Sequence, residues 1–181
     1  MGMTDRQKAP APPPSLRLIA MGGFQGYSLL DSGNGRKLER FGEIVVDRPE
    51  PQALWSPSRT DAWRGAHAVF AAEDEDEKGR WKQLKPVPDT WDVPVDGVTV
   101  KARLMAFRHL GLFPEQLPHW QWMREGLAGM KGEAPRVLNL FGYTGAASLI
   151  AAAAGAEVVH VDASKKAIGW ARENQAASKL D

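Results

Sequence analysis

The chain has 181 residues, of which 43% are hydrophobic and 25% charged, and its formal net charge is +1. These values are typical of a globular protein, and they exclude a disordered or collagen-like chain and a protein whose whole surface is basic. The absence of cysteine excludes a disulfide scaffold, a cysteine-ligated metal site and a cysteine nucleophile within these residues. We find no run of 18 apolar residues and no signal-peptide core, so we expect a cytoplasmic protein without a membrane span.

The first half of the chain is predicted to contain a leader and a β-rich region. Residues 1–15 are rich in proline and have almost nothing apolar to bury, which predicts a disordered leader. Residues 16–108 have the composition of a β-rich region. Within it, the acidic run 73–77 is expected to form a solvated loop, because adjacent carboxylates rarely converge on a metal without other ligands.

Two hairpins are predicted in this region. Their turns contain Asn34-Gly35 and Asp96-Gly97, residues that tolerate positive φ angles. The flanking strands are expected at residues 27–31 and 36–41 for the first hairpin, and at 91–95 and 98–104 for the second. A further short strand is expected at residues 43–47, before two prolines.

Four tryptophans are expected to supply much of the small β-rich core: Trp55, Trp63, Trp81 and Trp91. The alternative is that an exposed tryptophan stacks on a nucleic-acid base.

After the β-rich region, residues 108–116 are predicted to form a loop-like segment. An amphipathic helix is predicted over residues 118–130, because apolar side chains recur there at helical spacing. These side chains are Trp120, Met123, Leu127 and Met130.

The last fifty residues have the order strand, turn, helix, strand, helix. The predicted elements are a buried strand at 136–140, a turn at 141–145, a helix at 146–154, a buried strand at 157–161 and a helix at 165–178. Gly155 is expected to end the first helix, and Ser164 to cap the second. This order predicts two parallel strands joined by a right-handed crossover.

The polar and glycine-rich features fall at the carboxyl ends of both strands, where open parallel sheets bind ligands. The turn contains Gly142 and Gly145, and Asp162 follows 17 residues after Gly145. A glycine turn admits a ligand to the backbone, and a carboxylate at this distance suits a ribose diol. The turn lacks both the three-glycine dinucleotide fingerprint and a Walker loop, and its aromatic residues would crowd a pyrophosphate. We therefore favour S-adenosylmethionine (SAM) as the cofactor.

Three segments resemble a known family in the correct order and spacing. Val137-Leu-Asn-Leu-Phe-Gly-Tyr-Thr-Gly145 resembles the first SAM motif of class I methyltransferases related to the bacterial 23S rRNA large-subunit enzymes, including the cytosine-C5 type. Gly111-Leu-Phe-Pro-Glu-Gln116 and Val159-His-Val-Asp-Ala-Ser164 resemble two further motifs of that family. The resemblance covers residues 109–175. It implies a Rossmann-like α/β fold, SAM as cofactor and rRNA as the methyl acceptor.

The resemblance also implies roles for individual residues. Phe113 and Gln116 would close over SAM, Asp162 would bind the ribose hydroxyls, and Ala163 would lie beside the adenine. The methionine and ribose side would be lined by Asn139, Phe141, Gly142, Tyr143, Thr144 and Gly145. Aromatic residues at such a junction often only pack, and Asn139 is also suited to tying down the loop.

Residues 109–181 supply only the first two strands of the fold that this family has. The family's acceptor-site motif of the Asp-Pro-Pro-Lys type is absent, so catalytic residues are expected beyond Asp181. We expect a truncated record of a longer protein, and a fragment that neither transfers a methyl group nor binds SAM tightly.

Two other functions remain open at this stage. One is an NAD(P)-type oxidoreductase, and the other is a non-catalytic RNA-binding module. For the second, a basic face could be formed by Arg36, Lys37, Arg40, Arg59, Arg64, Arg103 and Arg108. No metal is expected, because His109, His119 and His160 have no ligand spacing, and His160 is expected to be a core residue of its buried strand.

Overall fold

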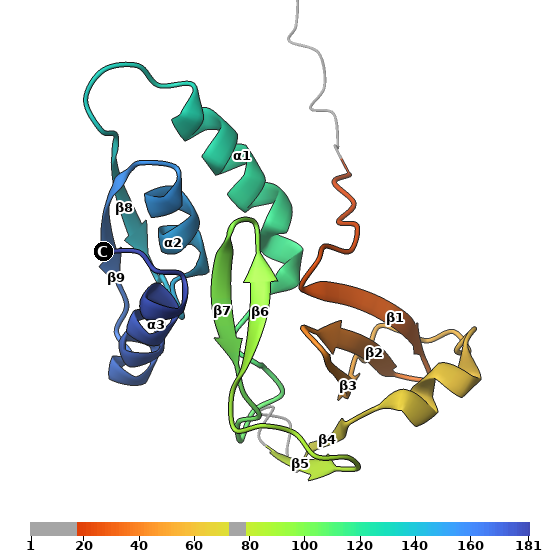
Figure 1. The fold of residues 1–181 in the computed structure, drawn as a ribbon. Helices are drawn as coiled ribbons and strands as arrows, with labels where there is room; N and C mark the ends of the chain where they lie inside the picture. The colour runs from red at the N-terminus through yellow and green to blue at the C-terminus, as the bar shows by residue number, and fades with distance from the viewer. Residues whose placement is uncertain (1–17, 73–78) are drawn as a thin grey trace, which may run out of the picture.

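The computed structural model describes residues 18–72 and 79–181, so the predicted leader and the acidic run lie outside the described residues. The N-terminal part is a five-stranded sheet in the order β1-β2-β3-β4-β5 (Figure 1). Its strands are β1 (Tyr27–Gly33), β2 (Arg36–Phe41), β3 (Ile44–Pro49), β4 (Ala68–Ala72) and β5 (Gly79–Gln83). β3 and β4 are parallel, and the connection between them contains the short 3₁₀ helix η1 (Thr60–Gly65). Neither the last two strands nor this parallel pair was predicted.

Both predicted hairpins are confirmed. In the first, Gly33 pairs with Arg36, which leaves Asn34-Gly35 as a two-residue turn with φ angles of 52° and 72°. The second hairpin consists of β6 (Trp91–Val95) and β7 (Val98–Ala102), joined by Asp96-Gly97 at φ angles of 44° and 89°. Positive φ at both central residues gives the turn a twist that matches the strands on either side.

The C-terminal part has the predicted α/β order. It contains η2 (Pro114–Gln116), α1 (Leu117–Ala128), β8 (Arg136–Leu140), α2 (Ala146–Ala153), β9 (Glu157–Val161) and α3 (Lys165–Ala177). β8 and β9 are parallel, and Ser164 caps α3 by accepting a hydrogen bond from the amide of Ala167 (3.2 Å). One boundary was wrong. α1 ends at Ala128, so Met130 lies past its last turn and is 61% exposed instead of packing.

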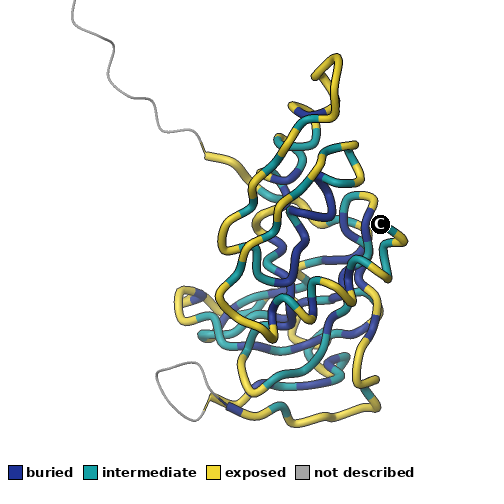
Figure 2. The backbone as a smooth tube through the Cα atoms, turned by 90° about the vertical axis from the view of Figure 1, so that its left-hand side faces the viewer, coloured by how far each residue is buried: buried dark blue, intermediate teal, exposed yellow. Residues whose placement is uncertain are grey.

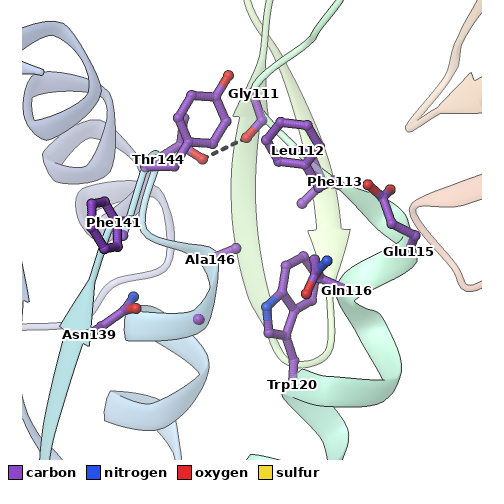
Figure 3. A pocket seen from close by; sticks show the side chains of 13 residues that line it. Gly111, Leu112, Phe113, Glu115, Gln116, Trp120, Asn139, Phe141, Thr144 and Ala146 are labelled. Atoms are coloured by element: carbon purple, nitrogen blue, oxygen red, sulfur yellow. Dashed lines mark hydrogen bonds between the residues drawn. The ribbon is translucent and has the colours of Figure 1, made fainter. Parts of the chain in front are cut away.

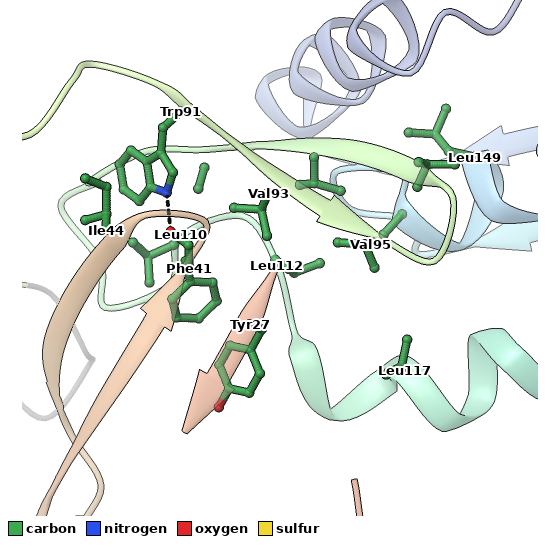
Figure 4. Close-up of a cluster of buried hydrophobic side chains, with 14 of the residues drawn as sticks. Tyr27, Phe41, Ile44, Trp91, Val93, Val95, Leu110, Leu112, Leu117 and Leu149 are labelled. Atoms are coloured by element: carbon green, nitrogen blue, oxygen red, sulfur yellow. Dashed lines mark hydrogen bonds between the residues drawn. The ribbon is translucent and has the colours of Figure 1, made fainter. Parts of the chain in front are cut away.

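The β6–β7 hairpin lies between the N-terminal sheet and the C-terminal part (Figure 1). Its valines Val93, Val95 and Val100 are almost completely buried in a core that runs from Tyr27 in β1 to Ile150 in α2 (Figure 4). The indole Nε1 of Trp91 donates to the carbonyl of Phe41 (2.9 Å), which ties the hairpin to β2. Figure 2 shows that the buried residues gather in the interior, with exposed residues on the surface loops. The predicted boundary at residues 108–109 stays a prediction.

The prediction that β8 and β9 are buried strands was wrong. Residues along both strands alternate between partly buried and exposed, and α2 packs on the partly buried face. The other face leaves Leu138 and Leu140 62% and 54% exposed, and Val159 and Val161 60% and 44% exposed. The reason is that no described residue packs over this second face, so these apolar runs have a partner on one side only.

The four tryptophans expected in the core differ in burial. Trp91 is 8% exposed and belongs to the core, while Trp63 and Trp81 are half-buried. The prediction that Trp55 packs in the core was wrong, because 58% of its surface is exposed. Its loop lies outside the sheet, and its indole Nε1 is bound at the edge of β1.

A buried ion pair lies inside the N-terminal sheet. Glu39 is 1% exposed and accepts two hydrogen bonds from Arg48, at 2.7 and 2.8 Å, and one from the hydroxyl of Tyr27 at 2.9 Å. Arg48 also donates to the carbonyl of Arg108 (2.9 Å). Burial and the neighbouring Glu39 carboxylate raise the pKa of the Tyr27 phenol far above its usual range. The network therefore connects the sheet to the segment that leads into the C-terminal part.

We predict that Arg48→Met lowers the free energy of unfolding by about 3–5 kcal/mol, because it removes both guanidinium hydrogen bonds from the buried Glu39 carboxylate and, among the described residues, leaves it only the Lys37 ammonium, at 3.9 Å, as a cation. Urea denaturation measures this loss. Arg64→Gln is the control, since its pair with Asp61 joins side chains that are 87% and 93% exposed, and it should cost at most about 1 kcal/mol. Equal losses in the two variants would contradict the role assigned to Arg48.

Candidate functional site

The turn after β8 folds over the end of β9. The amide of Gly142 donates to the carbonyl of Val161 (3.0 Å), and the amide of Tyr143 donates to Oδ2 of Asp162 (2.8 Å). The turn requires left-handed backbone at Phe141, Tyr143 and Gly145, with φ angles of 54°, 52° and 91°. Two of these residues are aromatic, so the turn holds a conformation that costs free energy and that the surrounding hydrogen bonds must maintain.

Asp162 is fixed by its backbone partners. Besides the bond from Tyr143, its Oδ1 accepts from the amide of Ser164 (2.8 Å). The amides of Ser164 and then Tyr143 lower the pKa of the Asp162 carboxyl below its ordinary value. The carboxylate is therefore charged and oriented at the carboxyl ends of both parallel strands, and each oxygen keeps lone pairs for further donors.

The turn lies against the imidazole of His160. A Cβ atom on Gly142 would come within 2.3 Å of Cε1 of His160 and within 3.1 Å of Nδ2 of Asn139. Nδ2 of Asn139 donates to Oγ of Ser148 (2.8 Å), and this oxygen is hydrogen-bonded to Nδ1 of His160 (2.8 Å). His160 is partly buried, as part of this network and not in a fully buried strand. Only glycine fits at position 142 without moving this network.

The segment 111–116 forms the opposite wall. The hydroxyl of Thr144 donates to the carbonyl of Gly111 (2.6 Å), which joins this wall to the turn. The ring of Phe113 packs against that of Tyr143, with centroids 5.3 Å apart. Gly111 has a φ angle of 95°, and a Cβ there would come within 2.2 Å of the Trp170 ring. Burial, followed by the charge of Asp162, raises the pKa of the Tyr143 hydroxyl.

A cavity of about 320 Å³ lies between the two walls. Figure 3 shows Asn139 and Phe141 on one side of it, with Gln116 and Trp120 on the other. The predicted residues that line it are Phe113, Gln116, Asn139, Phe141, Gly142, Tyr143 and Thr144. Thr144 is 1% exposed, so its contribution is mainly to fasten the two walls.

Three predicted residues lie elsewhere. Gly145 precedes α2, and it packs against α3, since a Cβ on it would lie 3.1 Å from that of Ala171. Asp162 and Ala163 line a second cavity of about 260 Å³ beside the N-terminus of α3. The hydrogen bond from Tyr143 to Asp162 connects the turn to this second cavity.

Six residues that line the first cavity were not predicted as site residues: Gly111, Leu112, Glu115, Trp120, Ala146 and Ala147. Glu115 contributes an exposed carboxylate, and it lies inside a segment that had been recognised. Trp120 is 8% exposed and was assigned to helix packing from its spacing. The available sequence signal for Glu115 was a carboxylate two residues after Phe113 in the recognised segment. Periodicity cannot distinguish a core position from a cavity wall, so it offered none for Trp120.

Among the described residues, no group of three or more His, Asp or Glu side chains is arranged to hold a metal ion. Within the same part of the chain, none of the helices has the length and apolar character needed to cross a membrane.

The sequence model of the S-adenosylmethionine-dependent methyltransferase family matches residues 52–181. The chain belongs to this family. The predicted resemblance is confirmed, and the cofactor is SAM, not a dinucleotide. The family's fold, with a small sheet at the N-terminus, is shared with a SAM-dependent methyltransferase from Agrobacterium tumefaciens. The two chains are 49% identical and match with a TM-score of 0.84. The match covers 89% of this chain and 51% of the Agrobacterium chain.

Two further proteins are similar over part of the chain. The ribosomal RNA large subunit methyltransferase K/L of Shewanella oneidensis is 44% identical over 85 residues, which are 46% of this chain and 11% of that protein. A methyltransferase solved in complex with S-adenosylhomocysteine (SAH) shares the fold, with a TM-score of 0.65 and 19% identity. The match covers 87% of this chain and 43% of the chain in that structure. The chain therefore spans about a tenth of the curated relative and half of the Agrobacterium structure.

We predict that Gly142→Ala destabilises the protein by about 1–3 kcal/mol, because the new methyl group overlaps the His160 ring. Urea denaturation measures the change. The control is Gly169→Ala in α3, where a Cβ meets nothing within 4 Å. It should be neutral or stabilise the helix by up to about 1 kcal/mol. A Gly142 variant as stable as the control would show that the ring does not restrict the turn.

Proposed function

We propose that this chain forms the cofactor-binding part of a methyltransferase that transfers a methyl group from SAM to rRNA. The observation that carries the proposal is the hydrogen bond from the Tyr143 amide to Asp162, because it joins the glycine turn and the ribose-binding carboxylate into one site. The rRNA acceptor is supported by the identity to the Shewanella enzyme over 85 residues. With rRNA as the proposed substrate, we propose a cytoplasmic location.

In this proposal, different predicted residues bind different parts of the cofactor. Asp162 accepts hydrogen bonds from the ribose hydroxyls, and Ala163 lies on the adenine side. Asn139 and the turn 141–145 line the methionine side, where Phe113 and Gln116 close over the cofactor. Glu115 adds a carboxylate that suits the positive charge of SAM. These residues bind and orient the cofactor.

Bound SAM supplies an electrophilic methyl group, so the protein accelerates transfer by aligning that group with an acceptor atom. We assign no catalytic residue within residues 1–181. In this proposal, the turn and segment 111–116 would enclose the cofactor on one side only, and the apolar face of β8 and β9 has no described residue packed over it. We therefore expect these 181 residues alone to bind SAM weakly and to transfer no methyl group.

We predict that millimolar SAH raises the melting temperature of this chain and that NAD⁺ at the same concentration does not, since a ligand stabilises only the state that binds it. Asp162→Ala should abolish the SAH shift, while Asp61→Ala, an exposed position in η1, should keep it. Isothermal calorimetry should show no micromolar SAM binding. A shift with NAD⁺ alone would contradict the proposed cofactor site, and micromolar SAM binding would contradict the weak affinity.

The acceptor is tested separately in cells. Disruption of the gene should remove one methylated nucleoside from rRNA, measured by mass spectrometry of digested rRNA. A full-length allele carrying Asp61→Ala should restore that nucleoside, and a full-length allele carrying Asp162→Ala should not. An unchanged set of rRNA nucleosides after disruption would overturn rRNA as the acceptor.

A further inference from the structure

Trp55 is exposed and yet held in place. The side chain is 58% exposed, but its Nε1 donates to the carbonyl of Ser32 (3.0 Å) and lies 3.2 Å from the Ser32 hydroxyl. An exposed tryptophan that only fills space gains nothing from a fixed orientation. Here the polar edge of the indole is used by the protein itself, so most of the remaining ring surface is presented to solvent in one orientation.

The loop that carries Trp55 is fastened to β1 and its turn. The carbonyl of Trp55 accepts from the amide of Asn34 (2.8 Å). Asp31 is 7% exposed and accepts from Nε1 of Trp63 and the amide of Arg59 (both 2.8 Å), and from the amide and hydroxyl of Ser58. The bond from Trp63, followed by the backbone bonds, lowers the Asp31 pKa. The loop is therefore preorganised, which reduces the entropy lost on binding a partner.

Three cations of the predicted basic face are held in ion pairs. Arg36 is paired with Asp47 (2.6 Å) and Lys37 with Glu50 (3.0 Å), and Arg103 is paired with Glu173. These pairs neutralise much of the predicted face.

Three exposed cations lie in or beside η1, which packs against β1. Arg59 is exposed and makes no ion pair with any residue that the structure describes. The Arg64 side chain is 87% exposed and lies 3.9 Å from Asp61. The Lys85 ammonium lies at the carbonyl of Gly65 (2.9 Å), at the end of η1.

The indole of Trp55 and the backbone of Arg59 are anchored at consecutive residues of β1. The indole of Trp55 is bound at Ser32, and the amide of Arg59 at Asp31. Consecutive Cα atoms are about 3.8 Å apart, so the two anchors are neighbours on β1. Leu54, which is 86% exposed, adds an apolar side chain next to the indole in the sequence. An aromatic face with adjacent cations is the combination that single-stranded nucleic acids bind.

We propose that Trp55, Arg59, Arg64 and Lys85 form a surface, here termed the Trp55 platform, that binds single-stranded RNA. A base stacks on the indole, and the cations contact the phosphates on either side. The proposal rests on the proposed function, because it assigns the Trp55 platform a part in holding the rRNA substrate. A protein partner would use the same apolar surface, but it would not need the exposed cations Arg59, Arg64 and Lys85.

The test is fluorescence anisotropy with a fluorescein-labelled 12-nucleotide single-stranded RNA and the 181-residue chain. Trp55→Ala should weaken binding about 5- to 150-fold, the range expected for the loss of one stacked base. Trp55→Phe should retain part of the affinity. The matched control is Trp122→Ala in α1, where the side chain is 77% exposed, and it should leave the affinity unchanged. Arg59→Gln should reduce the slope of log affinity against log salt concentration by about 1, the change expected for the loss of one phosphate contact.

Three outcomes would overturn the proposal. One is RNA binding by the wild-type chain that Trp55→Ala leaves unchanged, and another is an equal loss in the Trp122 variant. The third is no RNA binding by the wild-type chain, which is the result expected if this surface binds a protein instead. Thermal melting of each variant checks that it is folded. The rRNA methylation measured after gene disruption is independent of these results, so failure of the Trp55 platform and failure of the proposed function can be told apart.

Discussion

The side-chain amide of Asn174 holds the site together. This residue is fully buried in α3, where its Oδ1 accepts from the amide of Lys101 in β7 and its Nδ2 donates to the carbonyl of Thr144 in the turn, both at 2.8 Å. Thr144 in turn donates to Gly111. One amide therefore connects the central hairpin, the last helix, the glycine turn and the opposite wall. Since a buried amide must satisfy both its donor and its acceptor, these elements have little freedom to shift separately.

This network explains how a strained turn persists. Phe141 and Tyr143 adopt left-handed backbone that costs free energy, and the amides of the turn are held by Val161 and Asp162. The amide of Ser164 and then the same bond from Tyr143 lower the Asp162 pKa, so the geometry of the turn contributes to the charge of the carboxylate. The N-terminal sheet contributes differently. Its buried Glu39–Arg48 pair reaches the carbonyl of Arg108, close to the start of the wall at Gly111.

Local patterns predicted those features that depend on neighbours in the sequence. Asn34-Gly35 and Asp96-Gly97 allow positive φ with little cost, so both hairpins follow from them. The order of strands and helices after residue 136 and the SAM motifs were also readable. Burial was less predictable. An apolar strand such as β8 indicates a face that can be covered, but not whether a neighbour covers it, and the spacing of Trp120 fits a core or a cavity wall equally well.

The sequence by itself determined the family, the SAM cofactor and the local conformations of turns and caps, because these depend on residues that are close along the chain. The tertiary structure decided which side chains meet. It placed Gly111 against Trp170, Thr144 against Gly111 and Trp55 against Ser32, contacts that span from 23 to 59 residues. Such contacts arise when separate elements pack on the central hairpin, and no local propensity encodes that packing. For the same reason, only the structure distinguished the paired arginines from those that remain exposed beside Trp55.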